Sequence, residues 1–292
     1  MISSFGILLL AGLALAVPVF GIGLSDLVKA AELSEDPSNL NLLRYFQVLQ
    51  SVGLFVIPSF LAALFFSAAP VRYLSMDRSP GFWVFTFTAL AVFSSMPFIN
   101  WLIGINEAMS LPVWLGEIEQ WMQDTEDQAA ALTEAFLKMP DTGTFFFNLF
   151  MIAVIPAFGE EMVFRGVLQR LFGEWLGNIH LAVLLSALCF SAMHMQFYGF
   201  IPRFVLGMFL GYMLVFSGSL WVPVLAHFFQ NGTVVVITWM ESTGYLKIDA
   251  DTFGQSENGW VILLSGILMA GWLMMIRWRI SYRKKYILKI NE

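Results

Sequence analysis

Eight long apolar stretches constrain this chain more than any other feature of its sequence. They cover residues 4–23, 51–69, 82–103, 144–164, 179–196, 203–217, 220–239 and 260–276. A helix needs about 20 apolar residues to cross the hydrocarbon layer of a bilayer. A secretory signal peptide has Lys or Arg before its apolar region. No Lys or Arg precedes the first stretch, so we expect a membrane span there as well. The pattern predicts an all-α, polytopic transmembrane helix bundle of about eight spans.

The composition agrees with a membrane location. Hydrophobic residues make up 58% of the chain and charged residues 12%, against about 25% charged residues in an average soluble domain. Too few polar side chains remain to cover a soluble surface, which excludes a soluble enzyme and a disordered chain. The net charge of -6 argues against a nucleic-acid partner. We therefore expect a chain surrounded by the lipid bilayer, with no nucleic acid bound.

Charged residues sort by loop and predict the side of the membrane that each loop occupies. Loops 24–50 and 104–143 are acidic, whereas loop 70–80 carries Arg72 and Arg78, and the C-terminal tail carries six basic residues. Basic loops stay on the cytoplasmic side of a membrane. The pattern therefore predicts that both termini are cytoplasmic and that both acidic loops lie outside.

One membrane domain, residues 1–292, is the simplest organisation, because no linker or internal repeat divides the chain. In the extracytoplasmic loop 104–143, apolar residues recur at helical spacing: Trp114, Leu115, Ile118, Trp121 and Met122. They predict an amphipathic helix that either lies on the membrane surface or packs over the outer mouth of the bundle. Gly207 and Gly211 form a G-x-x-x-G pattern, which predicts close helix packing inside the bundle.

Ionisable residues inside the apolar stretches are few and concentrated. With one polar neighbour, they lie in or directly after the fourth, fifth and seventh stretches: Glu160, Glu161, Arg165, His194, His227 and Asn231. Such residues are costly in a bilayer, and they usually face the bundle interior or a water-filled cavity. No other stretch between residues 51 and 240 has comparable groups in its interior. We therefore expect these side chains to form the functional site.

Helical spacing predicts how these side chains lie. Glu161 and Arg165 are four residues apart and can pair on one helix face, which leaves Glu160 free to point elsewhere. If the fourth helix continues for about two turns beyond Arg165, Glu160 and His194 differ in height by only roughly 6 Å. If that extension lies in the cytoplasm, Glu160 and His194 are at the same height in the bundle as His227. We expect the site that they form to open to the cytoplasmic side.

A carboxylate, two imidazoles and an amide suit the activation of water. A carboxyl group in a low-dielectric cavity can act as a general base, and a histidine can share the water or relay its proton. A second histidine and an asparagine can donate hydrogen bonds to the oxyanion of a tetrahedral intermediate. These residue types favour a hydrolytic reaction.

Three motifs resemble those of the CPBP intramembrane proteases, a family that includes the type II CAAX prenyl endopeptidases and the bacterial Abi, or bacteriocin-processing, proteins. Residues 160–165 (EEMVFR) resemble the family's E-E-x-x-x-R motif. Residues 190–194 (FSAMH) resemble F-x-x-x-H, and residues 227–231 (HFFQN) resemble H-x-x-x-N. The resemblance covers about residues 145–240, and the motifs follow one another in the family's order.

The resemblance implies a glutamate-type intramembrane endopeptidase that needs no metal or other cofactor, with its catalytic core in residues 144–240. Glu160 would activate water with help from His194. His227 and Asn231 would stabilise the oxyanion. The substrate would be a membrane-associated protein or peptide.

Two more motif residues, Glu161 and Arg165, would support the architecture of the site. The resemblance also implies a multi-pass integral protein of the bacterial cytoplasmic membrane. Prenylated CAAX proteins are substrates of the eukaryotic branch, so CAAX processing is not carried over to this chain. The sequence predicts no oligomeric state.

Other interpretations fit part of the pattern. Two histidines and a carboxylate could bind zinc or iron, although no H-E-x-x-H motif is present. A non-catalytic membrane scaffold or a bacteriocin-immunity protein could use the same fold. A transporter could use the buried groups as a proton relay, but no inverted repeat supports this. Taken singly, each polar residue could also be structural, with Asn231 linking two helices.

Overall fold

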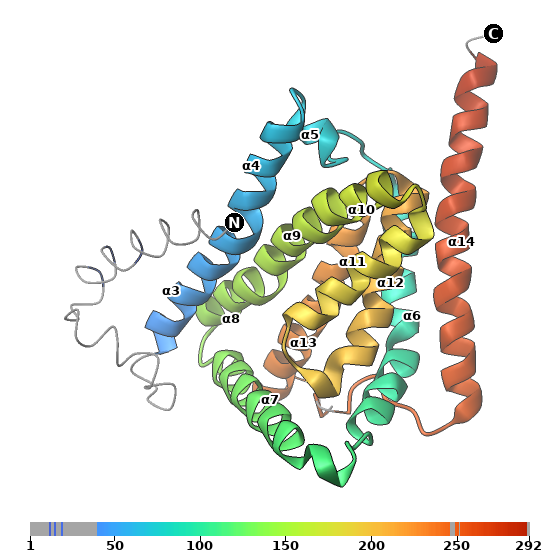
Figure 1. Ribbon diagram of the computed structural model, residues 1–292. Coiled ribbons are helices and arrows are strands. Elements are labelled where there is room, and N and C mark those ends of the chain that lie inside the picture. Colours follow the sequence, from blue (N-terminus) through green and yellow to red (C-terminus); the bar gives the residue numbers. More distant parts are fainter. Residues whose placement is uncertain are drawn as a thin grey trace.

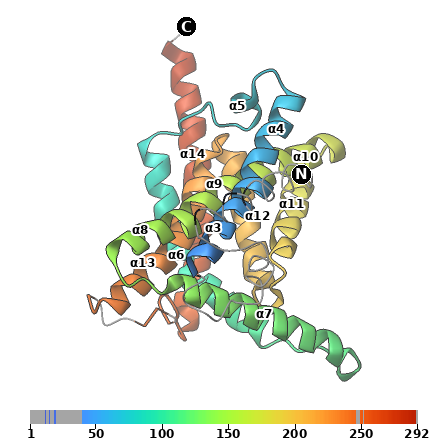
Figure 2. The same cartoon turned by 90° about the vertical axis from the view of Figure 1, so that its left-hand side faces the viewer.

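The part of the chain that the computed structural model describes comprises residues 40–245, 249–250 and 252–290, with Gly12, Leu15 and Val19, and of residues 283–290 only the backbone. Every regular element in this part is a helix (Figure 1). The helices pack into a bundle, and one helix lies across an end of it (Figure 2). This arrangement confirms the all-α fold class.

The chain forms long helices that contain short π-helical turns. In chain order the segments are α3 (Leu40–Ser51), η2 (Val52–Val56), α4 (Ile57–Phe66), α5 (Pro70–Tyr73), α6 (Phe82–Glu107), η3 (Val113–Leu115), α7 (Gly116–Leu137), α8 (Thr142–Asn148), η4 (Leu149–Val154), α9 (Ile155–Glu161), η5 (Met162–Leu168), α10 (Gln169–Leu176), α11 (Ile179–Met193), η6 (Phe197–Gly199), α12 (Phe200–Ser217), α13 (Trp221–Ser242) and α14 (Gly259–Ile290). The segments η2, η4 and η5 are π-helical, and η3 and η6 are 3-10 helices. From α8 to α10 the helix is unbroken, which confirms that it continues past Arg165.

Within the described residues, six helices are long and apolar enough to cross a membrane: Leu40–Phe66, Phe82–Glu107, Thr142–Leu176, Phe197–Ser217, Trp221–Ser242 and Gly259–Tyr282. A further apolar helix, α11, has 15 residues, fewer than the roughly 20 that a full crossing needs. Apart from three positions, the first apolar stretch, residues 4–23, lies outside the described residues. The number of eight spans and the side of the termini therefore stay predictions.

Two prolines lie in the long helices just after π-helical turns. Pro58 follows η2, and Pro156 follows η4. A proline has no N–H to donate, and its ring clashes with the carbonyl four residues earlier. A π-helical turn is wider than an α-helical turn and often marks a functional site. Here it gives the proline room without ending the helix that carries Glu160.

A third proline, Pro97, lies inside α6, and a serine of α14 bonds the backbone beside it. The Ser265 hydroxyl donates to the Ser94 carbonyl (2.6 Å) and accepts from the Phe98 N–H (3.1 Å). In an unbroken α-helix these two backbone groups would bond each other. Ser265 therefore fastens α14 to α6 at this point.

We expect Ser265→Ala to lower the free energy of unfolding by about 1–3 kcal/mol, because it leaves backbone groups in the interior without a partner. Thermal unfolding of the purified protein in detergent measures the effect. Thr86→Ala is the matched control, since this exposed hydroxyl bonds a carbonyl of its own helix and no other described residue. An unchanged unfolding temperature for Ser265→Ala would contradict the role of this contact.

The bundle has two ends, and we call one of them the basic end. It comprises the loop 67–81 and the turns 177–178 and 218–220, at the top of Figure 1. The Leu220 N–H donates to the Ser75 carbonyl (2.9 Å), which joins one turn to this loop. Both turns begin with a glycine of positive φ, 63° at Gly177 and 66° at Gly218, a conformation that favours glycine at a helix end.

The opposite end, which we call the acidic end, comprises residues 107–141, 194–199, 243–245 and 252–258. The helix α7 crosses this end at the bottom of Figure 1. Arg44 holds the C-terminal part of α7, because its Nη2 donates to the Phe136 and Lys138 carbonyls (3.3 and 3.2 Å). The C-terminal part of α7 is therefore fastened to the bundle, whereas Trp114, Ile118 and Trp121 near its other end are exposed. The contact of its exposed apolar residues with lipid stays a prediction.

Close packing of α11 against α12 depends on two glycines. A Cβ at Gly207 would lie 3.0 Å from the Ala187 Cβ, and one at Gly211 would lie 2.9 Å from a Val183 methyl group. The G-x-x-x-G pattern thus packs helices inside the bundle, as predicted. This contact brings α12 against the helix that ends at His194.

Candidate active site

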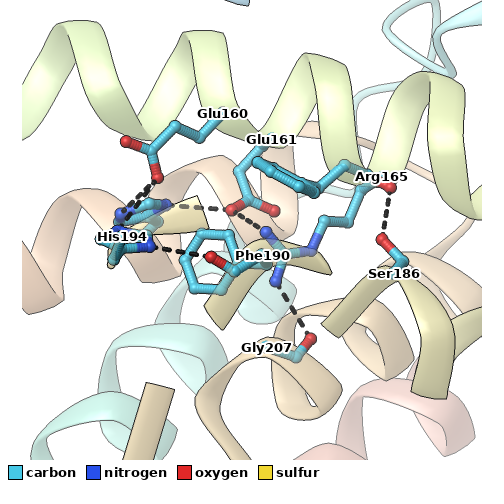
Figure 3. A network of polar contacts seen from close by, with 9 residues as sticks. Glu160, Glu161, Arg165, Ser186, Phe190, His194 and Gly207 are labelled. Carbon is cyan, nitrogen blue, oxygen red and sulfur yellow. Dashed lines mark hydrogen bonds and ion pairs between the residues drawn. The ribbon is translucent and has the colours of Figure 1, made fainter. Parts of the chain in front are cut away.

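Three helices bring one carboxylate and two imidazoles together (Figure 3). Glu160 lies near the end of α9, His194 directly follows α11, and His227 lies in the second turn of α13. The Glu160 Oε2 atom is 3.9 Å from His194 Nε2 and 4.0 Å from His227 Nε2. Glu160 is buried, and its Oε2 has no hydrogen-bond partner among the described residues. One carboxylate oxygen therefore faces two imidazole nitrogens, too far for direct hydrogen bonds but close enough to share a small ligand.

The neighbouring carboxylate has a different environment. Glu161 and Arg165 form an ion pair of 2.6 Å between Oε1 and Nη1, and both side chains are completely buried. The same Oε1 atom accepts a hydrogen bond from His227 Nδ1 (2.9 Å). Arg165 also donates from Nη2 to the Gly207 carbonyl (3.0 Å). Glu161 and Arg165 thus connect α9, η5, α12 and α13, and their supporting role in a reaction stays a prediction.

The first residue of the F-x-x-x-H motif packs at the centre of this network. The Phe190 ring lies 4.4 Å from the Arg165 Cζ atom, and its centroid is 5.0 Å and 5.9 Å from those of His194 and His227. A guanidinium over an aromatic face gains a cation–π interaction. The ring therefore holds Arg165 and both histidines in fixed relative positions.

Hydrogen bonds set the proton positions of both imidazoles. His194 Nδ1 lies 2.8 Å from the Phe190 carbonyl oxygen, which can only accept, so Nδ1 carries a proton. His227 Nδ1 carries a proton in the same way, since it donates to Glu161. In a neutral imidazole the other nitrogen is then an acceptor. Both Nε2 atoms beside Glu160 can therefore accept a proton or a hydrogen bond.

Asn231 lies one turn after His227 and lines the same cavity as the histidines. Its Nδ2 donates to the Ile152 carbonyl (3.1 Å), four residues before Pro156. Pro156 has no N–H to donate to that carbonyl, so Asn231 supplies the hydrogen bond instead. One amide hydrogen of Asn231 is used in this way, and the second remains available to a ligand.

The side chains border a cavity of about 450 Å³ that includes Glu160, His194, His227 and Asn231 in its lining. Pockets of this size hold small ligands. The cavity extends to Glu107, Glu126 and Gly199 and so reaches the acidic end.

The sequence predicted an opening toward the end that carries loop 70–80, and this prediction was wrong. The cause is the short helix α11, which has 15 residues, whereas α6 has 26 and α13 has 22. Because α11 ends early, the longer helices project beyond His194 and enclose a space on the acidic side. Met195 turns the chain there with a φ of 54°, which is uncommon for a residue other than glycine.

Sequence reasoning overlooked a group of polar residues at the mouth of the cavity. Arg203 donates from Nη1 and Nη2 to the backbone and side-chain oxygens of Gln196 (2.9 and 2.7 Å). Gln196 Nε2 donates to Glu126 Oε1 of α7 (3.1 Å), and the Tyr198 N–H donates to Glu126 Oε2 (3.3 Å). Arg203 was overlooked because it is the first residue of the sixth apolar stretch, 203–217, and so was placed at the end of a span. The helix α12 begins at Phe200, which places Arg203 inside it.

The described residues contain no group of three His, Cys, Asp or Glu side chains placed to hold a metal ion. Whether the site works without a metal stays a prediction. The fold and the polar cluster together define an α-helical integral membrane protein with a buried glutamate–histidine site.

Comparison with known proteins places this site in a family context. Residues 142–233 match the family model described as type II CAAX prenyl endopeptidase Rce1-like. The match confirms the resemblance predicted from the three motifs, all of which lie within it. The uncharacterized protein YpbD of Bacillus subtilis (strain 168) is 34% identical over 85 residues, which are 28% of this chain and 40% of that protein. The matched part therefore spans less than half of that relative. No solved structure matches the chain.

Proposed function

We propose that this protein is an intramembrane endopeptidase that hydrolyses a peptide bond of a membrane-associated protein or peptide. The observation that carries the proposal is the Glu160 carboxylate, which faces two imidazole Nε2 atoms at 3.9 and 4.0 Å within a buried cavity. The Rce1-like match over residues 142–233 supports the same reaction class. Cleavage of a peptide by the purified protein and by its Glu160→Gln variant tests the proposal.

In the proposed reaction Glu160 is the general base. It removes a proton from water, and the resulting hydroxide attacks the scissile carbonyl carbon. His194 accepts a hydrogen bond from this water at Nε2, because its Nδ1 proton is held by the Phe190 carbonyl. The C–N bond breaks as the proton passes from Glu160 to the leaving nitrogen. One water is consumed, and one carboxylic acid and one amine are formed.

The oxyanion needs hydrogen-bond donors. Asn231 has one amide hydrogen left after its bond to Ile152. His227 can donate from Nε2 only as an imidazolium, since its other N–H already bonds Glu161. A neighbouring carboxylate stabilises such a cation, as in other enzymes with a carboxylate behind the histidine. We propose that these residues act without a metal ion, as the family resemblance implies.

The charge distribution supports a proposal about the side of the membrane. Arg72, Arg78 and Arg170 belong to the basic end or lie beside it, whereas loop 104–143 forms much of the acidic end. The positive-inside rule then places the basic end in the cytoplasm. Since the cavity reaches the acidic end, we propose that its mouth faces the outside of a bacterial cytoplasmic membrane. The cleaved segment of the substrate would reach the site from that side.

Single cysteines can test this orientation. In a Cys189→Ser background, Ser110→Cys and Ser79→Cys place one thiol at each end, both at exposed positions. We expect a membrane-impermeant maleimide to label the Ser110→Cys variant in intact cells and the Ser79→Cys variant only after permeabilisation. Labelling in the reverse order would overturn the proposed orientation.

A further inference from the structure

We propose that Arg203 forms a carboxylate-binding subsite in the catalytic cavity. This inference rests on the proposed function. It predicts that the substrate carries an anionic group near the scissile bond. None of the three motifs includes Arg203, and its position inside α12 places a cation in an apolar helix. An ionisable residue in a membrane span marks a functional site by default.

The charge of the Arg203 guanidinium supports this inference. Both hydrogen bonds of the Arg203 guanidinium go to oxygens of Gln196, a neutral residue. Among the described residues, no carboxylate lies within ion-pair distance of Arg203. By contrast, the other arginine beside the site, Arg165, has a buried ion pair with Glu161. Arg203 therefore keeps a positive charge that an incoming anion can pair with.

The backbone beside Arg203 leaves room for its side chain. A Cβ at position 199 would lie 2.6 Å from Arg203 Nη1 and 2.7 Å from its Cζ. Glycine at this position lets the guanidinium lie flat against the backbone at the edge of the cavity. Gln196 then holds the guanidinium from one side through two oxygens. The fork of an arginine held in this way suits a carboxylate, which can bind two N–H groups together.

The charges that line the cavity support the same inference. Its described lining contains three carboxylates, Glu107, Glu126 and Glu160, and one guanidinium, that of Arg203. A substrate carboxylate would be repelled at these three carboxylates and attracted to Arg203. Glu126 accepts hydrogen bonds from Gln196 and from the Tyr198 N–H, and it forms no ion pair with Arg203. Arg203 would thus fix the direction in which a substrate lies relative to Glu160.

The experiment measures the binding of three probes to the purified full-length protein by ligand-observed NMR. N-acetylleucine has a terminal carboxylate, N-acetylleucinamide is its neutral counterpart, and N-acetylaspartic acid α-amide has only a side-chain carboxylate. We expect at least one acid to bind about tenfold more tightly than the neutral amide, as expected for a charge-assisted hydrogen bond. The acid that shows this preference identifies a terminal or a side-chain carboxylate as the natural group.

Variants assign the preference to Arg203. We expect Arg203→Gln to remove it, and Arg203→Lys to keep part of it, since lysine retains the charge but not the fork. Gly199→Ala keeps the arginine and displaces it, so it should also reduce the preference. Arg170→Gln, at a residue near the basic end, is the matched control and should bind as the wild type does.

Two results would overturn the proposal. The first is that neither acid binds the wild type better than the neutral amide does. The second is a preference that survives in Arg203→Gln, which would leave Arg203 a structural tie to Gln196. Glu160→Gln separates this inference from the proposed function, because it should keep the probe preference while losing cleavage.

Discussion

Replacing Glu160 with glutamine should lower the rate of peptide cleavage by about 10²–10⁴-fold, the usual contribution of a general base. The amide has nearly the same shape as the carboxylate but cannot remove a proton from water. Since Glu160 Oε2 has no hydrogen-bond partner among the described residues, the change breaks no bond of the fold. The loss should therefore appear in kcat, with the thermal unfolding temperature preserved.

The measurement uses the purified protein in detergent and a library of quenched fluorescent peptides that carry an apolar anchor. A chelator is present throughout, so that full wild-type activity would also support a reaction without a metal. Glu174→Gln is the matched control, because this carboxylate is exposed and pairs with Arg170 alone among the described residues. A Glu160→Gln variant that cleaves at the wild-type rate would rule out Glu160 as the base.

Arg165→Met should destabilise the protein more than any other single change discussed, by about 3–5 kcal/mol. The Arg165 and Glu161 side chains are completely buried and 2.6 Å apart. Removing the arginine leaves the Glu161 carboxylate in an apolar interior with His227 as its remaining partner. It also removes the donor to the Gly207 carbonyl, which joins η5 to α12.

Thermal or chemical unfolding in detergent measures this loss. Lys138→Met is the matched control, since Lys138 and Glu134 have the same four-residue spacing but are both exposed. Exposed pairs of this kind contribute about 0.2–1 kcal/mol. The double variant Glu161→Gln/Arg165→Met should recover part of the loss, because no unpaired buried charge remains. Equal effects for Arg165→Met and Lys138→Met would contradict the importance of the buried pair.

The residues of the candidate site could be predicted from the sequence because polar groups are scarce in its apolar stretches. The spacing of Glu161 and Arg165 indicated a pair on one helix face, and the structure shows that pair. The continuation of the fourth helix past Arg165 was needed for Glu160 to meet His194, and the structure shows it too. Both predictions concern residues on one helix or one hairpin, for which local geometry suffices.

Other features of the site depend on contacts between distant segments. The bond from Asn231 to the Ile152 carbonyl needs α13 and η4 to lie side by side, at a height that spacing does not reveal. The link from Arg203 through Gln196 to Glu126 joins α12 to α7, and Glu126 lies 70 residues before Gln196 in the chain. Charge patterning showed which loops are acidic, but it did not show that the cavity reaches them.

The sequence by itself determined that this is an α-helical membrane protein, where most of its helices lie, and which polar residues belong together. Hydrophobicity, charge and helical spacing are local properties, because each depends on residues that are close together in the sequence. Only the tertiary structure decided which helices the Glu161–Arg165 pair joins, because its bonds to His227 and to the Gly207 carbonyl reach across the bundle. It also decided that the cavity reaches the acidic end, because this follows from the short length of α11 relative to the helices packed around it.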